Sequence, residues 1–199
     1  MSLSPELQYR LAQADALIFD MDGTLVDTMP LHYIAWQQVA EHYRLPFSKP
    51  RFYQLGGVPT FETLQILSAE AGLEIDLQAA KAMKEGLSRA LMPKATPIAE
   101  TLAIVQQFFG TKPLAIATGS SRAGAQMLLG QLELAHYFDA LVTADDVARH
   151  KPAPDVFLAA AQRLNVAPER CVAFEDTDIG IEAILSAGMS AVDVRDLIK

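Results

Sequence analysis

The sequence is poor in cysteine, in basic residues and in long apolar runs. Its single cysteine, Cys171, has no partner for an internal disulfide, which fits a reducing compartment. Because 16 basic residues stand against 24 acidic ones, the formal net charge is −8, and nucleic acids and anionic membrane surfaces are unfavourable partners. No run approaches the roughly 20 apolar residues of a membrane-spanning helix, and the first ten residues lack the pattern of a signal peptide. We therefore expect a cytoplasmic protein without nucleic-acid or membrane partners, and nothing in the sequence implies an obligate protein partner.

The chain does contain enough apolar residues for a folded domain. Its 199 residues are 51% hydrophobic, a length that fits one domain or one domain with an insertion. Five short apolar runs are typical of strands buried on both faces: 16–19, 113–117, 140–142, 171–174 and 191–194. Segments with helical spacing lie between the later runs. This alternation predicts a parallel α/β sheet.

The first two predicted strands are separated by a long helical segment. About 90 residues lie between them, whereas a strand–helix–strand crossover needs roughly 30. Helical spacing is found at Leu31–Tyr43, Thr60–Ala71 and Leu77–Leu91. We therefore predict a core domain formed by residues 1–27 and 93–199, and a helical domain, residues 28–92, inserted after the first strand.

Two aspartates follow the first predicted strand. Asp20 ends the apolar run, and Gly23 permits a sharp turn that returns Asp22 toward Asp20. In open α/β sheets, ligands bind beyond the carboxyl ends of the strands, where these carboxylates would lie. An ordinary turn with a capping aspartate is the simpler alternative. A calcium loop of the EF-hand type is excluded, because its glycine stands at the sixth position and Gly23 is the fourth.

Three more strand ends carry polar groups. Each has a simpler alternative. Thr118-Gly119-Ser120 fits a turn and helix cap as well as an anion site. Lys151, which is followed by Pro152 and Pro154, fits a solvated lysine before a helix. Glu175-Asp176 fits a helix start as well as a cation site. Together, however, they bring carboxylates, a hydroxyl and a lysine to one edge of the sheet. Phosphoryl transfer with one divalent metal requires this combination.

With these motifs the chain resembles the haloacid dehalogenase-like hydrolase superfamily over residues 14–197. The resemblance rests on Asp20-Met21-Asp22-Gly23-Thr24, Thr118-Gly119-Ser120, Lys151-Pro152-Ala153-Pro154 and Glu175-Asp176. It is greatest to β-phosphoglucomutase-like proteins and the related sugar-monophosphate phosphatases, notably fructose-1-phosphate phosphatases. It implies a doubly wound, Rossmann-like sheet with strand order 3-2-1-4-5 and an inserted α-helical cap, formed here by residues 28–92.

The resemblance also implies roles for the motif residues. Asp20 would be the nucleophile that forms an aspartyl-phosphate, and Asp22 would be the acid and base. A magnesium ion would be held by Asp20, the backbone carbonyl of Asp22, Glu175 and Asp176. The phosphate would be bound by four residues: Thr118, Gly119, Ser120 and Lys151.

The cap departs from part of this family. Sugar phosphomutases of this branch have an arginine just after the cap's glycine loop, which clamps the distal phosphate. Here Gly56 and Gly57 are followed by Val-Pro-Thr-Phe, without a basic residue. Losing a bidentate clamp disfavours a bisphosphate intermediate and favours a phosphatase. Lys84 or Arg89 could partly substitute for that arginine.

His32 stands where such caps carry a histidine near the site, although a packing or surface role fits it equally well. The expected substrate and cap residues are therefore His32, Gly56, Gly57 and Lys84.

We therefore expect a magnesium-dependent phosphatase of small sugar phosphates such as fructose-1-phosphate. A β-phosphoglucomutase-type sugar phosphomutase is the alternative within enzymes. A phospho-accepting signalling domain also places an aspartate, a hydroxyl and a lysine at strand ends, but it has no equivalent of Asp22 and no cap of this size. An inactive family member is disfavoured, because every catalytic position is present.

Overall fold

The computed structural model describes residues 3–198; Met1, Ser2 and Lys199, which the predicted core domain includes, lie outside the described residues. The chain divides into two compact units. One, the core unit, runs up to Asp27 and resumes at Thr96; the other, the cap unit, is Thr28–Ala95. The second boundary falls three residues later than the predicted one, after Ala95.

Within residues 3–198, five parallel strands form a single sheet in the order β3-β2-β1-β4-β5. The strands are β1 (Ala16–Phe19), β2 (Leu114–Ala117), β3 (Ala140–Val142), β4 (Cys171–Glu175) and β5 (Ser190–Asp193). The strand order confirms the predicted fold class. Because β1 lies at the centre, between β2 and β4, the residues that follow these three strands emerge side by side.

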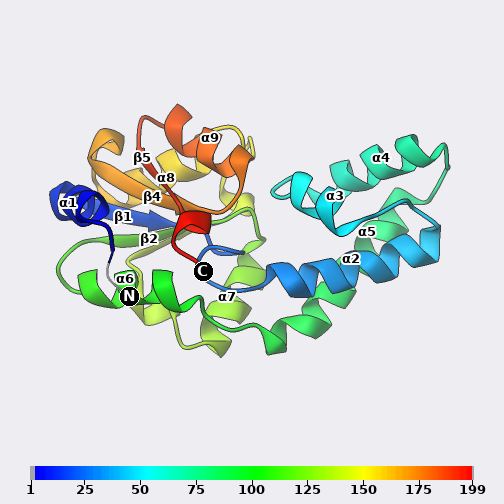
Figure 1. Cartoon of the computed structure of the whole chain (residues 1–199), viewed down its shortest axis with the longest axis horizontal. Coiled ribbons are helices and arrows are strands. Elements are labelled where there is room, and N and C mark those ends of the chain that lie inside the picture. The colour runs from blue at the N-terminus through cyan, green and yellow to red at the C-terminus, as the bar shows by residue number, and fades with distance from the viewer. Residues whose placement is uncertain (1–2, 199) are drawn as a thin grey trace. The chain divides into compact units, whose positions relative to one another are not determined.

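Helices cover both faces of the sheet (Figure 1). Helices α8 and α9 lie over one face, and α6 and α7 lie over the other. The α-helices of the core unit are α1 (Pro5–Gln13), α6 (Ala99–Phe108), α7 (Arg122–Gln131), α8 (Asp155–Leu164) and α9 (Asp178–Ser186). Single 3₁₀ turns complete this unit: η2 (Ala135–Tyr137), η3 (Ala144–Asp146), η4 (Pro168–Arg170) and η5 (Val194–Asp196).

The central strands are buried on both faces, which explains their continuous apolar sequences. All residues of β1, β2 and β4 are buried. Toward α8 and α9, Ala16 and Ile18 pack with Phe157 and Ile184 in one apolar cluster. Elsewhere in the core, the ring of Phe19 stacks on Phe174, with 4.4 Å between centroids. This packing fixes the strand ends from which the polar groups project.

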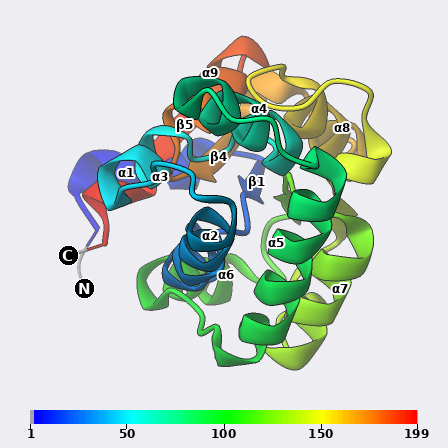
Figure 2. The ribbon, with the colours of Figure 1, turned by 90° about the vertical axis from the view of Figure 1, so that its right-hand side faces the viewer.

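The cap unit is helical (Figure 2), and its buried apolar side chains form a core of its own. Its elements are α2 (Met29–Tyr43), α3 (Lys49–Gln54), α4 (Thr60–Ala71), α5 (Leu77–Leu91) and the 3₁₀ turn η1 (Met92–Lys94). Trp36, Val39, Leu64 and Leu67 are buried in this core. The predicted helices at 60–71 and 77–91 match α4 and α5 residue for residue.

Three helices have no counterpart among those expected from sequence: α1, α3 and α6. Helix α1 buries only Leu7 and Leu11, and α3 is a single short helix that buries only Phe52. Helix α6 buries Thr101, Ile104 and Val105 and exposes Gln106 and Gln107. Of the helices that the structure describes, none is long and apolar enough to cross a membrane.

Candidate active site

Asp20 follows β1 directly and is 5% exposed. Its backbone N–H donates to the carbonyl of Phe174 on β4, 3.0 Å away, so the strand pairing extends to this residue. The chain then turns sharply at Gly23, which has a φ of +86°. A Cβ at Gly23 would overlap the carboxylate of Asp176, so only glycine permits both the turn and this close approach.

The amine of Lys151 lies between two carboxylates. Its Nζ is 2.7 Å from Oδ1 of Asp20 and 2.6 Å from Oε2 of Glu175, and the three side chains are at most 8% exposed. The same amine lies 4.9 Å from the ring centroid of Phe157. Lys151 is therefore not a solvated lysine, because two charged hydrogen bonds hold it at the edge of the sheet.

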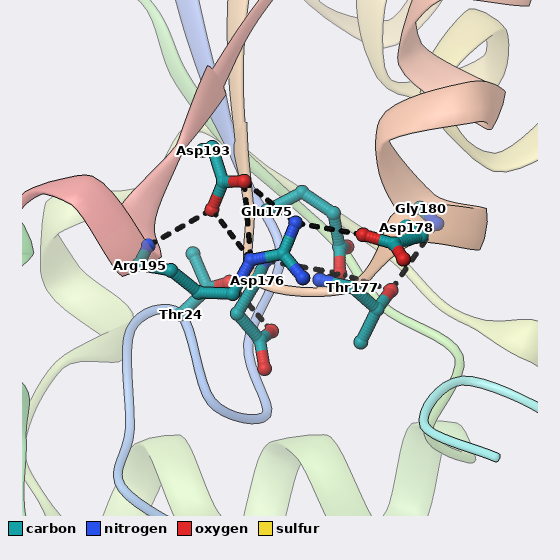
Figure 3. A network of polar contacts seen from close by, with 8 residues as sticks. All are labelled: Thr24, Glu175, Asp176, Thr177, Asp178, Gly180, Asp193 and Arg195. Atoms are coloured by element: carbon teal, nitrogen blue, oxygen red, sulfur yellow. Dashed lines mark hydrogen bonds and ion pairs between the residues drawn. The ribbon is translucent and has the colours of Figure 1, made fainter. Parts of the chain in front are cut away.

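The turn from β4 to α9 wraps around the other oxygen of Glu175 (Figure 3). This Oε1 accepts hydrogen bonds from the Thr177 backbone N–H at 2.9 Å and from the Thr177 hydroxyl at 2.7 Å. The hydroxyl of Thr177 also caps α9 by accepting from the N–H of Gly180. A Cβ at Gly180 would overlap the side chain of Glu175. The turn thus fixes Glu175 through its own sequence.

Asp176 is bonded to the turn that follows β1. The hydroxyl of Thr24 donates to its Oδ1 at 3.1 Å. The carbonyl of Thr24 accepts in turn from the buried hydroxyl of Thr101 on α6, at 2.7 Å. Helix α6 therefore holds the turn that contains Asp22 and Thr24, and Thr24 in turn contacts Asp176.

An arginine beyond β5 connects the start of α9 to the end of the sheet (Figure 3). The guanidinium of Arg195 donates to Asp178 at 2.8 Å and to Asp193 at 2.6 Å. Because Asp178 is the first residue of α9, this pair of contacts links β5 to the turn that holds Glu175 and Asp176.

The segment after β2 contacts Asp22. Thr118 is fully buried, and its hydroxyl accepts from the N–H of Ser120 at 3.0 Å. The hydroxyl of Ser120 donates to Oδ2 of Asp22 at 2.7 Å. Gly119 is exposed between them. The sequence assigns Ser120 to phosphate binding; here its hydroxyl bonds the carboxylate of Asp22.

Burial and like charges set the protonation of this cluster. Burial raises the pKa of Asp20 well above its usual value, the Glu175 carboxylate raises it further, and Lys151 opposes the shift. Burial and the charge of Glu175 likewise raise the pKa of Asp176 to about 7, against the hydrogen bond from Thr24. Burial disfavours the charged form of Lys151, but the carboxylates of Asp20 and Glu175 outweigh it and raise its pKa.

The cluster fits a hard divalent cation. Asp20, Glu175 and Asp176 each offer a carboxylate oxygen, and these oxygens lie within 4.8 Å of one another. The set contains only oxygen, which magnesium prefers. Lys151 bonds two of these three carboxylates, so a cation would neutralise negative charge that Lys151 alone leaves in place.

In the cap unit, two of the predicted residues lie together. His32 Nδ1 is 3.3 Å from the hydroxyl of Ser88 and 3.5 Å from Nζ of Lys84. Lys84 is 9% exposed, and its amine lies 5.7 Å from the ring centroid of Trp36.

The remaining cap residues lie elsewhere in that unit. Gly56 and Gly57 form the turn after α3, where Gly57 has a φ of +83°. Arg89 is exposed on α5.

The chain matches the haloacid dehalogenase-like hydrolase family over residues 14–188. It belongs to that family. Among the relatives of this hydrolase, fructose-1-phosphate phosphatase YqaB of Escherichia coli is 45% identical over 180 residues, covering 90% of this chain and 95% of the relative. β-Phosphoglucomutase of Bacillus subtilis is 34% identical and covers 90% of this chain and 82% of the relative. These matches confirm the resemblance to this branch.

Solved structures agree with this assignment. The crystal structure of β-phosphoglucomutase from Clostridium difficile superposes with a TM-score of 0.80 at 25% identity, covering 92% of this chain and 87% of that one. The haloacid dehalogenase-like fold of the chain is therefore shared by phosphatases and by a mutase, and the fold does not decide between the two activities.

Several residues of the site were not assigned a role from sequence. Thr101 has no local signal, because a threonine on an apolar helix looks like any small core residue. Arg195 lies in a short charged segment after the last strand, and its contacts depend on where α9 begins. Thr177 does carry a signal, since a threonine directly before a helical segment is typical of an N-cap.

Proposed function

We propose that this hydrolase is a magnesium-dependent phosphatase of small sugar phosphates that works through an aspartyl-phosphate on Asp20. The observation that carries the proposal is the bonded cluster of Asp20, Lys151 and Glu175, with a carboxylate oxygen of Asp176 within 4.8 Å of oxygens of Asp20 and Glu175. A buried carboxylate beside a lysine, at the carboxyl end of the central strand, suits attack on phosphorus. The relative named as a fructose-1-phosphate phosphatase supports the same proposal.

In the first step, a carboxylate oxygen of Asp20 forms a bond to phosphorus while the bond from phosphorus to the sugar oxygen breaks. A proton from Asp22 passes to that sugar oxygen, which leaves as an alcohol. In the second step, water attacks phosphorus, its proton passes to Asp22, and the bond to Asp20 breaks. The covalent intermediate divides one difficult hydrolysis into two easier steps.

Lys151 contributes to both steps. Its ammonium favours the ionised, nucleophilic form of Asp20 and supplies positive charge beside the transferring oxygens. The hydroxyl of Thr118 and the backbone N–H groups near Gly119 would bind those oxygens from the side of β2.

Magnesium would be held by Asp20, Glu175, Asp176 and the backbone carbonyl of Asp22. When bound, it would supply positive charge to the phosphate oxygens in the transition state. Glu175 already bonds Lys151 and Thr177, so it would act on the metal directly or through a water molecule.

The cap favours a phosphatase over a mutase. No basic residue follows Gly56 and Gly57 before Glu62, and the nearest preceding arginine, Arg51, pairs with Glu70. A bisphosphate would therefore lack a bidentate clamp at this position. We assign substrate selection to the cap residues His32, Lys84, Gly56 and Gly57. The only partner that the proposed function requires is a small-molecule sugar phosphate. A sugar phosphomutase is the second candidate, because a mutase is among the relatives.

The test measures phosphate release from fructose-1-phosphate, glucose-1-phosphate, glucose-6-phosphate, 6-phosphogluconate and p-nitrophenyl phosphate. We expect release that requires magnesium and is abolished in Asp20→Asn, with a sugar phosphate preferred over the aryl phosphate. Isomerisation of β-glucose-1-phosphate in the presence of a bisphosphate primer, without phosphate release, would support the mutase instead. No reaction with any of these compounds would contradict both.

A further inference from the structure

Ser120 contacts the acid and base of the proposed reaction. Its hydroxyl oxygen lies 2.7 Å from Oδ2 of Asp22, across 98 residues of sequence. A serine hydroxyl carries one proton. While that proton is donated to Asp22, Ser120 has none to offer a phosphate oxygen. The contact therefore points to a role through Asp22.

Both ends of this hydrogen bond are fixed by the backbone. The N–H of Ser120 donates to the Thr118 hydroxyl at 3.0 Å, and its carbonyl accepts from the N–H of Ala144 at 3.1 Å. On the other side, the N–H of Gly23 donates to the carbonyl of Val26 at 2.9 Å and closes the turn that carries Asp22. The backbone that carries the Ser120 hydroxyl and the backbone that carries the Asp22 carboxylate are thus both fixed, each just after a strand.

We propose that Ser120 is a positioning residue that fixes Oδ2 of Asp22, so that Oδ1 carries the proton exchanged with the sugar oxygen and with water. The bond persists through both steps, because Oδ2 accepts from Ser120 when Asp22 is ionised and also when the proton resides on Oδ1. A backbone-fixed hydroxyl therefore keeps the carboxyl group in one orientation while its charge changes. This inference rests on the proposed function.

Leaving groups of different basicity separate this role from phosphate binding. A sugar alkoxide must be protonated as it leaves, whereas p-nitrophenolate leaves as an anion. Misplacing Asp22 should therefore slow release from the sugar phosphate and spare the aryl phosphate. The measured quantity is kcat/KM, because it covers the steps up to release of the alcohol and excludes the later attack by water.

The variants are Ser120→Ala, Ser120→Thr and the matched control Ser121→Ala. Ser121 is the adjacent serine, whose hydroxyl caps α7 by accepting from the N–H of Gly124. We expect Ser120→Ala to lower kcat/KM for the preferred sugar phosphate by about 10- to 100-fold, a part of the 10²- to 10⁴-fold that acid–base catalysis contributes. The aryl phosphate should change by less than about threefold, since its leaving group needs no acid. Ser120→Thr, which keeps the hydroxyl, should recover most of the lost kcat/KM. Ser121→Ala should leave kcat/KM unchanged for both the sugar phosphate and the aryl phosphate.

Two further measurements decide the outcome. In an Asp22→Ala background, Ser120→Ala should cause no additional loss, because the group that it positions is gone. Inhibition by inorganic phosphate should be the same in wild type and Ser120→Ala. Equal losses on both substrates, with weaker inhibition by phosphate, would overturn the inference and return Ser120 to phosphate binding. A wild-type protein that hydrolyses none of the substrates would instead overturn the proposed function, and this inference with it.

Discussion

The core unit and the cap unit each withdraw a lysine from solvent, and they hold it in different ways. Lys151 in the core donates to Asp20 and Glu175 at 2.7 and 2.6 Å. Lys84 in the cap lies 3.5 Å from a nitrogen of His32 and 5.7 Å from the ring centroid of Trp36. The core amine lies close to two carboxylates, and the cap amine lies close to an imidazole and an indole ring.

The largest effect should come from removing the core lysine. Lys151→Met leaves Asp20 and Glu175 buried without their cation, and breaking a buried pair in this way costs about 3–5 kcal/mol. Phosphate release should also fall by roughly 10²-fold or more, as expected for a lost charge at the transferring phosphate. Denaturant unfolding and release from the preferred sugar phosphate measure the two effects.

Lys84→Met is the matched variant in the cap. The methionine side chain can still pack near Trp36, but loss of the cation–π contact at this buried site should lower the free energy of unfolding by about 2 kcal/mol. Under the proposed function, KM for sugar phosphates should rise while turnover of p-nitrophenyl phosphate stays unchanged. Equal destabilisation by the two variants would show that the contrast between the lysines is wrong.

Two helix glycines sharpen the comparison next. Gly180→Ala on α9 places a Cβ against the side chain of Glu175, and such overpacking costs about 1–3 kcal/mol. It should also weaken magnesium binding, because Glu175 must move. Calorimetric titration with magnesium and thermal unfolding in its absence test the two parts separately.

Gly86→Ala on the cap helix α5 is the control, since nothing lies within 4 Å of a Cβ there. It should stabilise the protein by about 0.4–1 kcal/mol through the unfolded state and leave magnesium binding unchanged. If Gly180→Ala were tolerated as well as Gly86→Ala, the close contact with Glu175 would carry no constraint.

The same comparison shows which features of the molecule can be predicted from the sequence. The strand order is implied by the resemblance to the family and is confirmed. The gathering of Asp20, Lys151 and Glu175 could be predicted from the residues themselves, because short apolar runs end in polar residues and parallel strands bring those ends to one edge. The bond from Thr101 to Thr24 could not, because it joins residues 77 apart that only tertiary packing brings together. Likewise, the sequence placed Ser120 near the site but not its hydroxyl on Asp22.

The cap shows the same limit more strongly. Its helices α4 and α5 follow from helical spacing, yet the contact of His32 with Lys84 depends on how α2 packs on α5. Polar residues on separate helices have no local pattern that pairs them. The substrate selection that we propose for these cap residues is therefore harder to predict from the sequence than the catalytic motifs.

Asp146 gives a pH-dependent effect of intermediate size in the core. Burial opposes its ionisation, but hydrogen bonds from Arg122, Arg163 and Thr143 outweigh burial and hold the pKa of Asp146 below its usual range. Asp146→Asn should lower the free energy of unfolding at pH 7 by about 1–3 kcal/mol, as for hydrogen bonds to a charged group.

The sign of the pH dependence follows from the direction of that shift. Because the folded-state pKa is lowered, this stabilisation is complete above the unfolded-state value of about 4 and declines as the pH falls toward the folded-state value. The difference between wild type and Asp146→Asn should therefore be constant from pH 7 to 5 and narrow below about pH 4. A difference that stayed constant on acidification would mean that charge on Asp146 does not contribute.

The smallest effect should come from an exposed ion pair in the cap. Arg51 on α3 contacts Glu70 on α4, and their side chains are 31% and 44% exposed. Water and salt screen such a pair, so a double-mutant cycle with alanine should give a coupling of about 0.2–1 kcal/mol that shrinks in high salt. The core pair of Arg163 and Asp146, in which the Asp146 side chain is 14% exposed, should couple more strongly in the same cycle. A cap coupling equal to the core coupling, or insensitive to salt, would show that burial does not separate the two units in this respect.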